Sequence, residues 1–406
     1  MIPEGLSGKW QAGLSHRARR RDPHSLSSIL LLLAVAAAAA GQTAILAFLP
    51  ALVDGEAVGL APRVHDFHVA SLTAIHPLAA LLTAPLWGWL ADRMDYRVLL
   101  RTTLVILAFV TAPIGAVSLP ALYLLRAMAG MAAAAIIPLA LLSASFAVFE
   151  RGEQARRFTW LTAFVFLGDM VGPLLAEISA ALTPRIPLLM VALGIAGVAI
   201  LLYLAHLPPR CVACPEIRHA RASSRPATSM LLLIAAVGGG GLAAMHVALL
   251  VARGSDAPGR DTIAWMLSLC GFAMLAAQLF LARVAWLLTM PRRLASLTLA
   301  LLAASLFLFP LGHDALPLAG IIFVAGWSSA SLRLVTSFWI GGNAVASGSR
   351  LGLQHAAASI GQALGPSALA VASPQGQPVI LWTIGSLALL LLLFLPLFWR
   401  GPKAEP

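Results

Sequence analysis

Two long stretches without a charged residue constrain this chain more than any other feature. Between Asp22 and Asp54 lie 31 uncharged residues, and between Arg350 and Arg400 lie 49. An apolar stretch of about 18 residues is already long enough to cross the hydrocarbon core of a membrane as a helix. Only 11% of the 406 residues are charged and 60% are hydrophobic, whereas a soluble fold needs about 25% charged residues. Soluble, disordered and nucleic-acid-binding proteins are therefore excluded, the last despite a net charge of +11.

The apolar runs predict an all-α membrane protein with twelve transmembrane helices. Helices are required because lipid cannot satisfy free backbone groups, and the sequence lacks the alternating pattern of a membrane β-barrel. Breaking the runs at charges and at Pro and Gly residues places the helices at 28–52, 69–91, 97–117, 119–146, 158–182, 187–207, 229–252, 262–287, 294–312, 316–339, 351–372 and 378–399. The first run also fits a signal peptide cleaved near Ala44, but it continues to Val53. Since an ordinary signal-peptide core has about 7–15 residues, we expect a retained span.

The distribution of Arg and Lys predicts which helix ends are cytoplasmic. If the N-terminus is cytoplasmic, most of the Arg and Lys residues outside the predicted helices lie in cytoplasmic segments. The outside segments carry only Arg63, Arg185, Arg253 and Arg260. This is the bias of the positive-inside rule. We therefore expect a multi-pass protein of the cytoplasmic (inner) membrane with both termini in the cytoplasm, and the basic excess needs no nucleic-acid partner.

A repeated pattern predicts two equivalent halves. Gly-x-x-x-Gly-Pro occurs in the fifth and eleventh predicted helices, 193 residues apart, as Gly168, Gly172, Pro173, Gly361, Gly365 and Pro366. A polar connection, residues 208–228, separates six helices from six. We expect a basic cytoplasmic tail at 1–27, six-helix bundles at 28–207 and 229–399, a cytoplasmic central loop at 208–228 and a tail at 400–406. Such halves are related by an axis along the membrane normal; chance similarity among Ala- and Leu-rich helices is the alternative.

The connection between the second and third helices reads GWLADRMDYR from Gly88 to Arg97. It resembles the signature loop of the major facilitator superfamily through Gly88, Asp92, Arg93 and Arg97. It departs from that pattern at Asp95, where the family prefers glycine, and at the next position, where it prefers a basic residue. Asp tolerates the left-handed geometry of a tight turn better than most residues. The resemblance implies that Asp92 contacts the N-terminus of the eleventh helix and latches the halves in the outward-facing state; a charged turn that only sets topology is the alternative.

Charged residues inside the fourth and fifth helices are candidates for proton coupling. Arg126 and Gly130 resemble the Arg-x-x-x-Gly element of proton-coupled members of the superfamily. An arginine inside a span normally faces a cavity or an acidic partner. The fifth helix offers Asp169, near mid-membrane, and Glu177, closer to the depth of Arg126. We expect Asp169 or Glu177 to carry the proton and Arg126 to tune its binding; an inert salt bridge between the two helices is the alternative.

The Gly-x-x-x-Gly-Pro pattern of the fifth helix resembles the antiporter motif of exporters in the superfamily. Gly168 and Gly172 allow a neighbouring helix to approach closely, and Pro173 bends the helix. Packing alone would explain the glycines as well. Together with the loop around Asp92, the pattern is most similar to the twelve-span drug:proton antiporters, which implies the major facilitator fold and efflux.

Other polar residues within the helices are candidates for the wall of a substrate cavity. They are Gln42, His76, His246, Arg333 and His355, with Gln278, Gln354 and Gln362 as neutral hydrogen-bonding groups. We expect no metal site, because Cys211, Cys214 and His219 in the central loop lack a good fourth ligand.

The sequence thus predicts a proton-driven exporter of a small molecule rather than an enzyme. The proton gradient supplies the energy, no cofactor is expected, and no phosphate-binding Gly-x-x-x-x-Gly-Lys-Ser/Thr sequence is present. The expected partners are the small-molecule substrate and the lipid bilayer, and the expected state is a monomer.

Three alternatives remain open from the sequence. One is a dedicated exporter of an endogenous metabolite such as a siderophore, whose acidic groups Arg126, Arg333 and His246 would bind. Another is an uptake symporter, which the antiporter-like pattern opposes. The third is a polytopic membrane enzyme that uses the outer residues His65, Asp66 and His313.

Overall fold

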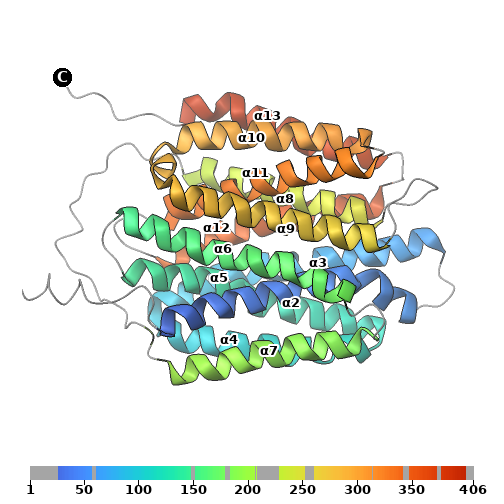
Figure 1. Ribbon diagram of the computed structural model, residues 1–406, viewed down its shortest axis with the longest axis horizontal. Helices are drawn as coiled ribbons and strands as arrows, with labels where there is room; N and C mark the ends of the chain where they lie inside the picture. Colours follow the sequence, from blue (N-terminus) through green and yellow to red (C-terminus); the bar gives the residue numbers. More distant parts are fainter. Residues whose placement is uncertain are drawn as a thin grey trace, which may run out of the picture.

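The computed structural model describes residues 26–398 apart from 57–60, 148–150, 179–182, 206, 208–227, 252–259, 313, 342–346 and 373–375. In that part of the chain, twelve long helices run side by side (Figure 1). The first half contains α2 (Leu26–Glu56), α3 (Pro62–Arg93), α4 (Tyr96–Thr111), α5 (Leu119–Ala147), α6 (Arg151–Ile178) and α7 (Arg185–Leu204). The second half contains α8 (Thr228–Leu250), α9 (Arg260–Arg283), α10 (Pro291–Leu308), α11 (Ala315–Gly341), α12 (Gly348–Val371) and α13 (Gln377–Phe398). This confirms the predicted all-α fold.

The outer surface of the bundle is suited to lipid. Within the described residues, 11 helices are long and apolar enough to cross a membrane. Large apolar side chains lie on the outside, such as Phe109 at 80% and Leu316 at 84% exposure. The remaining long helix, α12, has 24 residues but carries Gln354, His355 and Gln362. It packs between α3 and α8, which explains how a more polar helix is accommodated.

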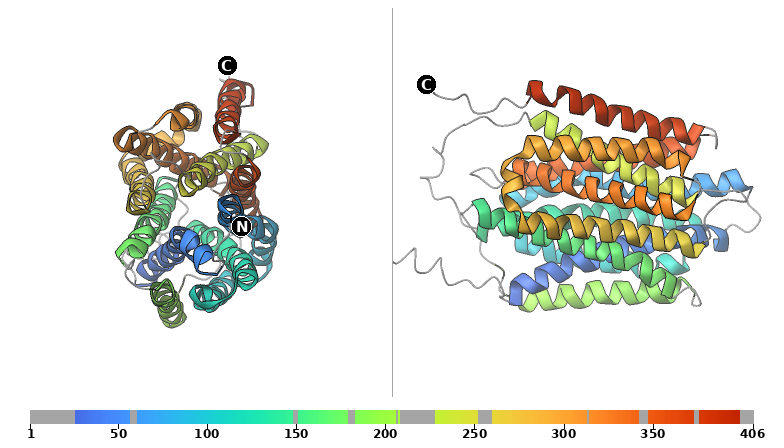
Figure 2. Two further views of the ribbon diagram at one scale, coloured as in Figure 1. Left: turned by 90° about the vertical axis from the view of Figure 1, so that its right-hand side faces the viewer. Right: turned by 45° about the horizontal axis from the view of Figure 1, so that its top comes forward.

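Equivalent helices pair in the same way in both halves. In the first half α2 packs on α6, α3 on α5 and α4 on α7; in the second, α8 packs on α12, α9 on α11 and α10 on α13. The halves meet where α3 packs on α12 and α6 packs on α9. Seen end-on, the blue-to-green first half and the yellow-to-red second half form two groups of helices (Figure 2). The packing therefore repeats as the sequence pattern does.

The repeated glycines hold the first and fifth helices of each half close together. A Cβ atom on Gly168 would lie 2.2 Å from a backbone oxygen of α2, and one on Gly361 would lie 1.8 Å from a backbone oxygen of α8. No side chain fits at such distances, so only glycine permits these contacts. Pro173 and Pro366 follow inside α6 and α12.

Helix boundaries differ from prediction at several ends. α3 begins at Pro62 instead of residue 69, since proline at the first position is pre-organised for a helix. α6 begins at Arg151 instead of residue 158, because Glu153 in its first turn pairs with Arg156 at 3.0 Å and Arg157 at 3.3 Å. Conversely, three predicted spans finish in short 3-10 helices, η1 (Ile114–Ala116), η3 (Ala285–Thr289) and η4 (Phe309–Leu311).

Candidate functional site

A cavity of about 240 Å³ lies between the two halves. Its described lining comes from α2, α3, α5 and α6 of the first half and from α8, α9, α11 and α12 of the second. The wall is largely apolar. Its charged, imidazole and amide side chains are Gln42, His76, Arg126, Asp169, His246, Arg333, Gln354, His355 and Gln362. Of the eight residues predicted for the cavity wall, all except Gln278 line this cavity.

Arg126 extends from α5 into this cavity and is only 3% exposed. Its Nε donates a hydrogen bond to the carbonyl oxygen of Leu72 at 3.3 Å, and its Nη1 donates to Oε1 of Gln42 at 3.1 Å. Among the ion pairs of the described residues, none includes Arg126. The salt bridge with Asp169 or Glu177 considered from the sequence is therefore not formed there, and the amide of Gln42 takes the place of the acidic partner.

Asp169 and Arg333 bring opposite charges to the cavity from opposite halves. Asp169 lies in α6 and Arg333 in α11, and their side chains interact electrostatically without forming an ion pair within the described residues. The guanidinium carbon of Arg333 also lies 6.0 Å from the centre of the Phe166 ring, one turn before Asp169. This contact between the halves was not foreseen, because an aromatic residue in an apolar helix gives no signal of its partner.

Three histidines extend the polar wall. His76 from α3 lies within electrostatic range of Arg126 and of His355 from α12, and His355 in turn lies near Arg333. Gly130, the glycine of the Arg-x-x-x-Gly element, permits this arrangement: a Cβ atom there would lie 2.2 Å from the backbone oxygen of His76. Polar groups thus connect Arg126 in the first half to Arg333 in the second.

His246 and Glu177 lie apart from that connection. Nε2 of His246 is 3.5 Å from Sγ of Cys270, which connects α8 to α9 at the cavity wall. Glu177 lies near the end of α6, half-buried, and is not among the described residues that line the cavity. Its proposed role in proton binding stays a prediction.

Gln278 is buried beside the cavity wall and connects the halves. The hydroxyl of Thr162 in α6 donates to Oε1 of Gln278 in α9 at 2.8 Å, and Nε2 of Gln278 donates to the carbonyl oxygen of Ala330 at 3.2 Å. Nearer the start of α6, the rings of Phe158 and Phe338 meet edge to face with centroids 6.3 Å apart. Thr162, Phe158 and Phe338 had no sequence signal, since Thr and Phe are ordinary in membrane helices, whereas Gln278 had been predicted for the cavity wall.

Asp92, at the end of α3, binds the first turn of α12. Its carboxylate accepts the backbone N–H of Gly348 at 2.7 Å and that of Ser349 at 3.0 Å. The hydroxyl groups of Ser347 and Ser349 also donate to it. Gly88 makes room for this contact, because a Cβ atom there would lie 2.4 Å from the backbone oxygen of Gly348. The expected contact between Asp92 and this helix is present, and the sequence had not indicated the two serines that complete it.

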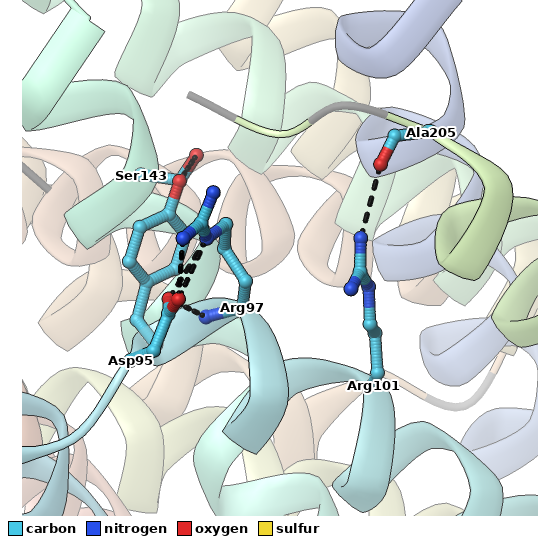
Figure 3. Close-up of polar contacts among 6 residues, drawn as sticks. Asp95, Arg97, Arg101, Ser143 and Ala205 are labelled. Carbon is cyan, nitrogen blue, oxygen red and sulfur yellow. Dashed lines mark hydrogen bonds and ion pairs between the residues drawn. The ribbon is translucent and has the colours of Figure 1, made fainter. Parts of the chain in front are cut away.

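Asp95 caps α4 and does not form a left-handed turn. Its φ is −69°, and its carboxylate accepts the backbone N–H of Arg97 at 3.0 Å. The Arg97 side chain donates to the same carboxylate from Nε at 2.9 Å (Figure 3). This hydrogen bonding by Arg97 holds the pKa of Asp95 below its ordinary value. The family's glycine position is thus filled by a helix N-cap, which Asp favours.

Other residues of the connection also bind their own half. Tyr96 is fully buried with its hydroxyl 3.4 Å from Oγ of Ser143 in α5. Arg101, farther along α4, donates to the carbonyl oxygens of Leu202 and Ala205 at the end of α7, each at 3.0 Å. Figure 3 shows the contact with Ala205. Arg93 lies over the Trp89 ring at 3.9 Å. Of the signature residues, Gly88 and Asp92 contact the second half. Arg93 and Arg97 instead contact Trp89 and Asp95 of their own half.

The residues considered for a membrane enzyme are arranged differently. His65 pairs with Asp54 and with Asp66, each at 3.2 Å, and His68 contacts the hydroxyl of Tyr123 at 3.0 Å. Within the described residues, no three His, Cys, Asp or Glu side chains are grouped as metal ligands. The other residues considered for metal or catalysis, Cys211, Cys214, His219 and His313, lie outside the described residues.

Comparison with known proteins identifies the family. The profile of the Major Facilitator Superfamily matches residues 31–255, although no curated protein matches the chain in sequence. The crystal structure of the human organic anion transporter MFSD10 (TETRAN) is similar with a TM-score of 0.73 at 16% identity, over 90% of this chain and 98% of that one. The proton:xylose symporter XylE, bound to 6-bromo-6-deoxy-D-glucose, is similar with a TM-score of 0.72 at 10% identity, over 92% of this chain and 95% of that one.

At these identities the two structures establish the fold alone. Because the family profile spans more than half of the sequence and the fold agrees over nearly all of it, the chain belongs to the Major Facilitator Superfamily.

Proposed function

We propose that the protein exports a small molecule from the cytoplasm in exchange for protons, with Asp169 as the proton-binding group. The position of Asp169 supports this most. It is the only acidic residue among the described residues that line the cavity. Its backbone also lies at the contact between the halves, because a Cβ atom on Gly271 of α9 would lie 2.9 Å from the carbonyl carbon of Asp169.

Proton binding at Asp169 would change the attraction between the halves. The ionised carboxylate attracts Arg333 of α11, and the protonated one does not. A proton therefore changes the relative free energies of the two access states, which is what coupling requires. Moving one charge through 100 mV supplies about 2.3 kcal/mol. This exceeds the 1.4 kcal/mol that shifts an equilibrium tenfold, so one proton is enough to bias transport.

Arg126 would influence Asp169 indirectly. Arg126 interacts electrostatically with His76, and His76 with His355. His355 in turn interacts with Arg333, and Arg333 with Asp169. Glu177 remains the second candidate for proton binding, because it lies two turns after Asp169 on the same helix.

The test is transport by full-length protein in proteoliposomes with an imposed pH gradient. A panel of labelled solutes first identifies one that moves uphill. We expect Asp169→Asn to abolish uphill movement of that solute while downhill exchange continues. Glu177→Gln, the matched control, should retain uphill transport. If Asp169→Asn still drives uphill export at the wild-type rate, Asp169 does not bind the coupled proton.

The same assay determines direction. The fold itself leaves this open, since the proton:xylose symporter shares it. The antiporter-like glycines of α6 favour exchange, in which the solute moves against the proton. Co-movement of solute and proton in the same direction would instead identify a symporter.

A dedicated exporter of an endogenous acidic metabolite, such as a siderophore, is the second candidate. The cavity wall presents two arginines and one carboxylate in its described part, and one protein of the same fold is a human organic anion transporter. Comparing the compounds secreted by strains with and without the gene tests this: loss of one acidic compound supports it, and broad drug sensitivity opposes it.

We also propose that the protein acts as a monomer in the cytoplasmic membrane, with both termini inside and no cofactor beyond the proton gradient. The arginine distribution supports the orientation. Fluorescent-protein and alkaline-phosphatase fusions at the C-terminus test it, because the first is expected to be active and the second inactive.

A further inference from the structure

Among the described residues, no carboxylate forms an ion pair with Arg126. The guanidinium is buried, and its two described hydrogen bonds go to neutral oxygens of Leu72 and Gln42. A buried cation without an acidic partner is costly in a membrane. Arg333 differs, because Asp169 lies within electrostatic range of it. The excess positive charge of the cavity is therefore concentrated at Arg126.

Two further polar groups near Arg126 have unused hydrogen-bonding capacity. Nε2 of Gln42 and Nε2 of His76 are fully buried and have no hydrogen-bond partner among the described residues. Gln42 uses its oxygen for Arg126, so its amide hydrogens remain available. His76 can present an N–H at Nε2 in the tautomer protonated there. Buried donors without partners are rare in proteins and call for an explanation.

We propose that Arg126, Gln42 and His76 form a subsite for the carboxylate of a small amphiphilic organic anion. The three side chains come from α5, α2 and α3 and line the same cavity. A carboxylate has the charge that Arg126 lacks and oxygen acceptors for the free donors. Apolar residues such as Leu46 and Ile137 line the cavity as well, which suits the apolar part of the anion. The cavity of about 240 Å³ is smaller than the roughly 300–1,000 Å³ of sites for drug-sized ligands, so the anion is small.

This inference rests on the proposed function only in taking the cavity as the transport site. Its test is equilibrium binding to the purified full chain in detergent, without a gradient. The probes are labelled naphthylacetate and its neutral and cationic counterparts, naphthylacetamide and naphthylethylamine. We expect naphthylacetate to bind roughly tenfold or more tightly than the amide. The reason is that a hydrogen bond to a charged group contributes more free energy than a neutral one, by an amount that changes a dissociation constant about tenfold. The amine should bind least.

Gln42→Glu is the decisive variant. It preserves the shape of the side chain that contacts Arg126 and supplies the missing carboxylate from within. We expect it to abolish the preference for naphthylacetate while the amide still binds. Gln362→Glu is the matched control, because it adds the same charge to the cavity wall from α12 and should leave most of the preference. Arg126→Gln should also abolish the preference for naphthylacetate. If Arg126→Gln does not fold, Gln42→Glu still tests the subsite.

Three results would overturn the subsite. The first is that naphthylacetate binds no more tightly than the amide, which includes no binding of either. The second is that Gln42→Glu retains the preference for naphthylacetate. The third is that Gln362→Glu loses this preference as fully as Gln42→Glu does, which would show that the added charge acts without a local site. Asp169→Asn separates this inference from the proposed function. It should lose uphill transport yet bind naphthylacetate at least as tightly as the wild type, because a negative charge has been removed from the cavity.

Discussion

Asp92→Asn tests whether the contact between α3 and α12 holds the halves together. In the present structure the carboxylate accepts two backbone N–H groups and the hydroxyls of two serines. The asparagine keeps the shape but loses the charge and one acceptor oxygen. If the remaining oxygen still accepts the backbone N–H and the hydroxyl of Ser349, the backbone N–H of Gly348 loses its acceptor.

The expected cost follows from those bonds. Hydrogen bonds to charged groups contribute about 1.5–3 kcal/mol and neutral ones about 0.5–1.5. A carboxylate at a helix N-terminus contributes about 0.3–1 kcal/mol more. Allowing for water at this exposed end, we expect the closed arrangement to lose about 2 kcal/mol. Since 1.4 kcal/mol is a factor of ten, the ratio of closed to open molecules should fall roughly thirtyfold.

The assay is a spin-label distance measurement between the halves. Labels at Arg156 in α6 and Arg292 in α10 lie on exposed side chains at the predicted cytoplasmic ends of the two halves, in a background without native cysteines. Asp92→Asn should add a population with a longer distance. Asp95→Asn is the matched control, because Asp95 binds Arg97 of its own half. If Asp92→Asn changes the distances no more than Asp95→Asn does, the contact does not hold the halves together.

Two further predictions concern stability, each measured by thermal unfolding of the purified protein. Gly361→Ala should cost about 1–3 kcal/mol by overpacking, because its Cβ atom must move from 1.8 Å to at least 3.4 Å from the nearest atom of α8; Gly320→Ala, where nothing lies within 4 Å, should be neutral or stabilising, and equal effects would contradict the packing argument. For Asp95, hydrogen bonding by Arg97 lowers the folded-state pKa, so its stabilisation is present above the unfolded-state pKa and is lost as pH falls through the folded one. The melting-temperature advantage of the wild type over Asp95→Asn should therefore be constant near neutral pH and shrink below roughly pH 4; an advantage that does not shrink would show that the Asp95 charge contributes nothing.

Local residue patterns predicted much of the candidate site. A charged or polar residue inside a membrane helix normally faces the protein interior, so His246 and Arg333 could be assigned to a cavity wall from sequence alone, and Arg126 to a cavity or an acidic partner. The contact of Asp92 with α12 could be expected from the loop that carries it. The first inference depends on an energy penalty that acts on one residue at a time, whereas the second depends on the resemblance of the loop to the superfamily's signature.

Partner choice could not be predicted in the same way. The sequence suggested an acidic partner for Arg126, and the structure gives it the amide of Gln42 instead. Depth along a helix can be counted from sequence, but the rotation of two helices about their axes depends on all of their packing contacts. The same is true of the pairing of Thr162 with Gln278.

The chain by itself determined that it spans a membrane as helices, because uncharged apolar runs leave no other stable arrangement, and it determined the twofold repeat, because the glycine pattern recurs at one spacing. Only the tertiary structure decided which polar groups face one another. Those pairings join residues more than eighty positions apart, such as Gln42 with Arg126 and Asp92 with Gly348, and their geometry is set by how twelve helices pack together.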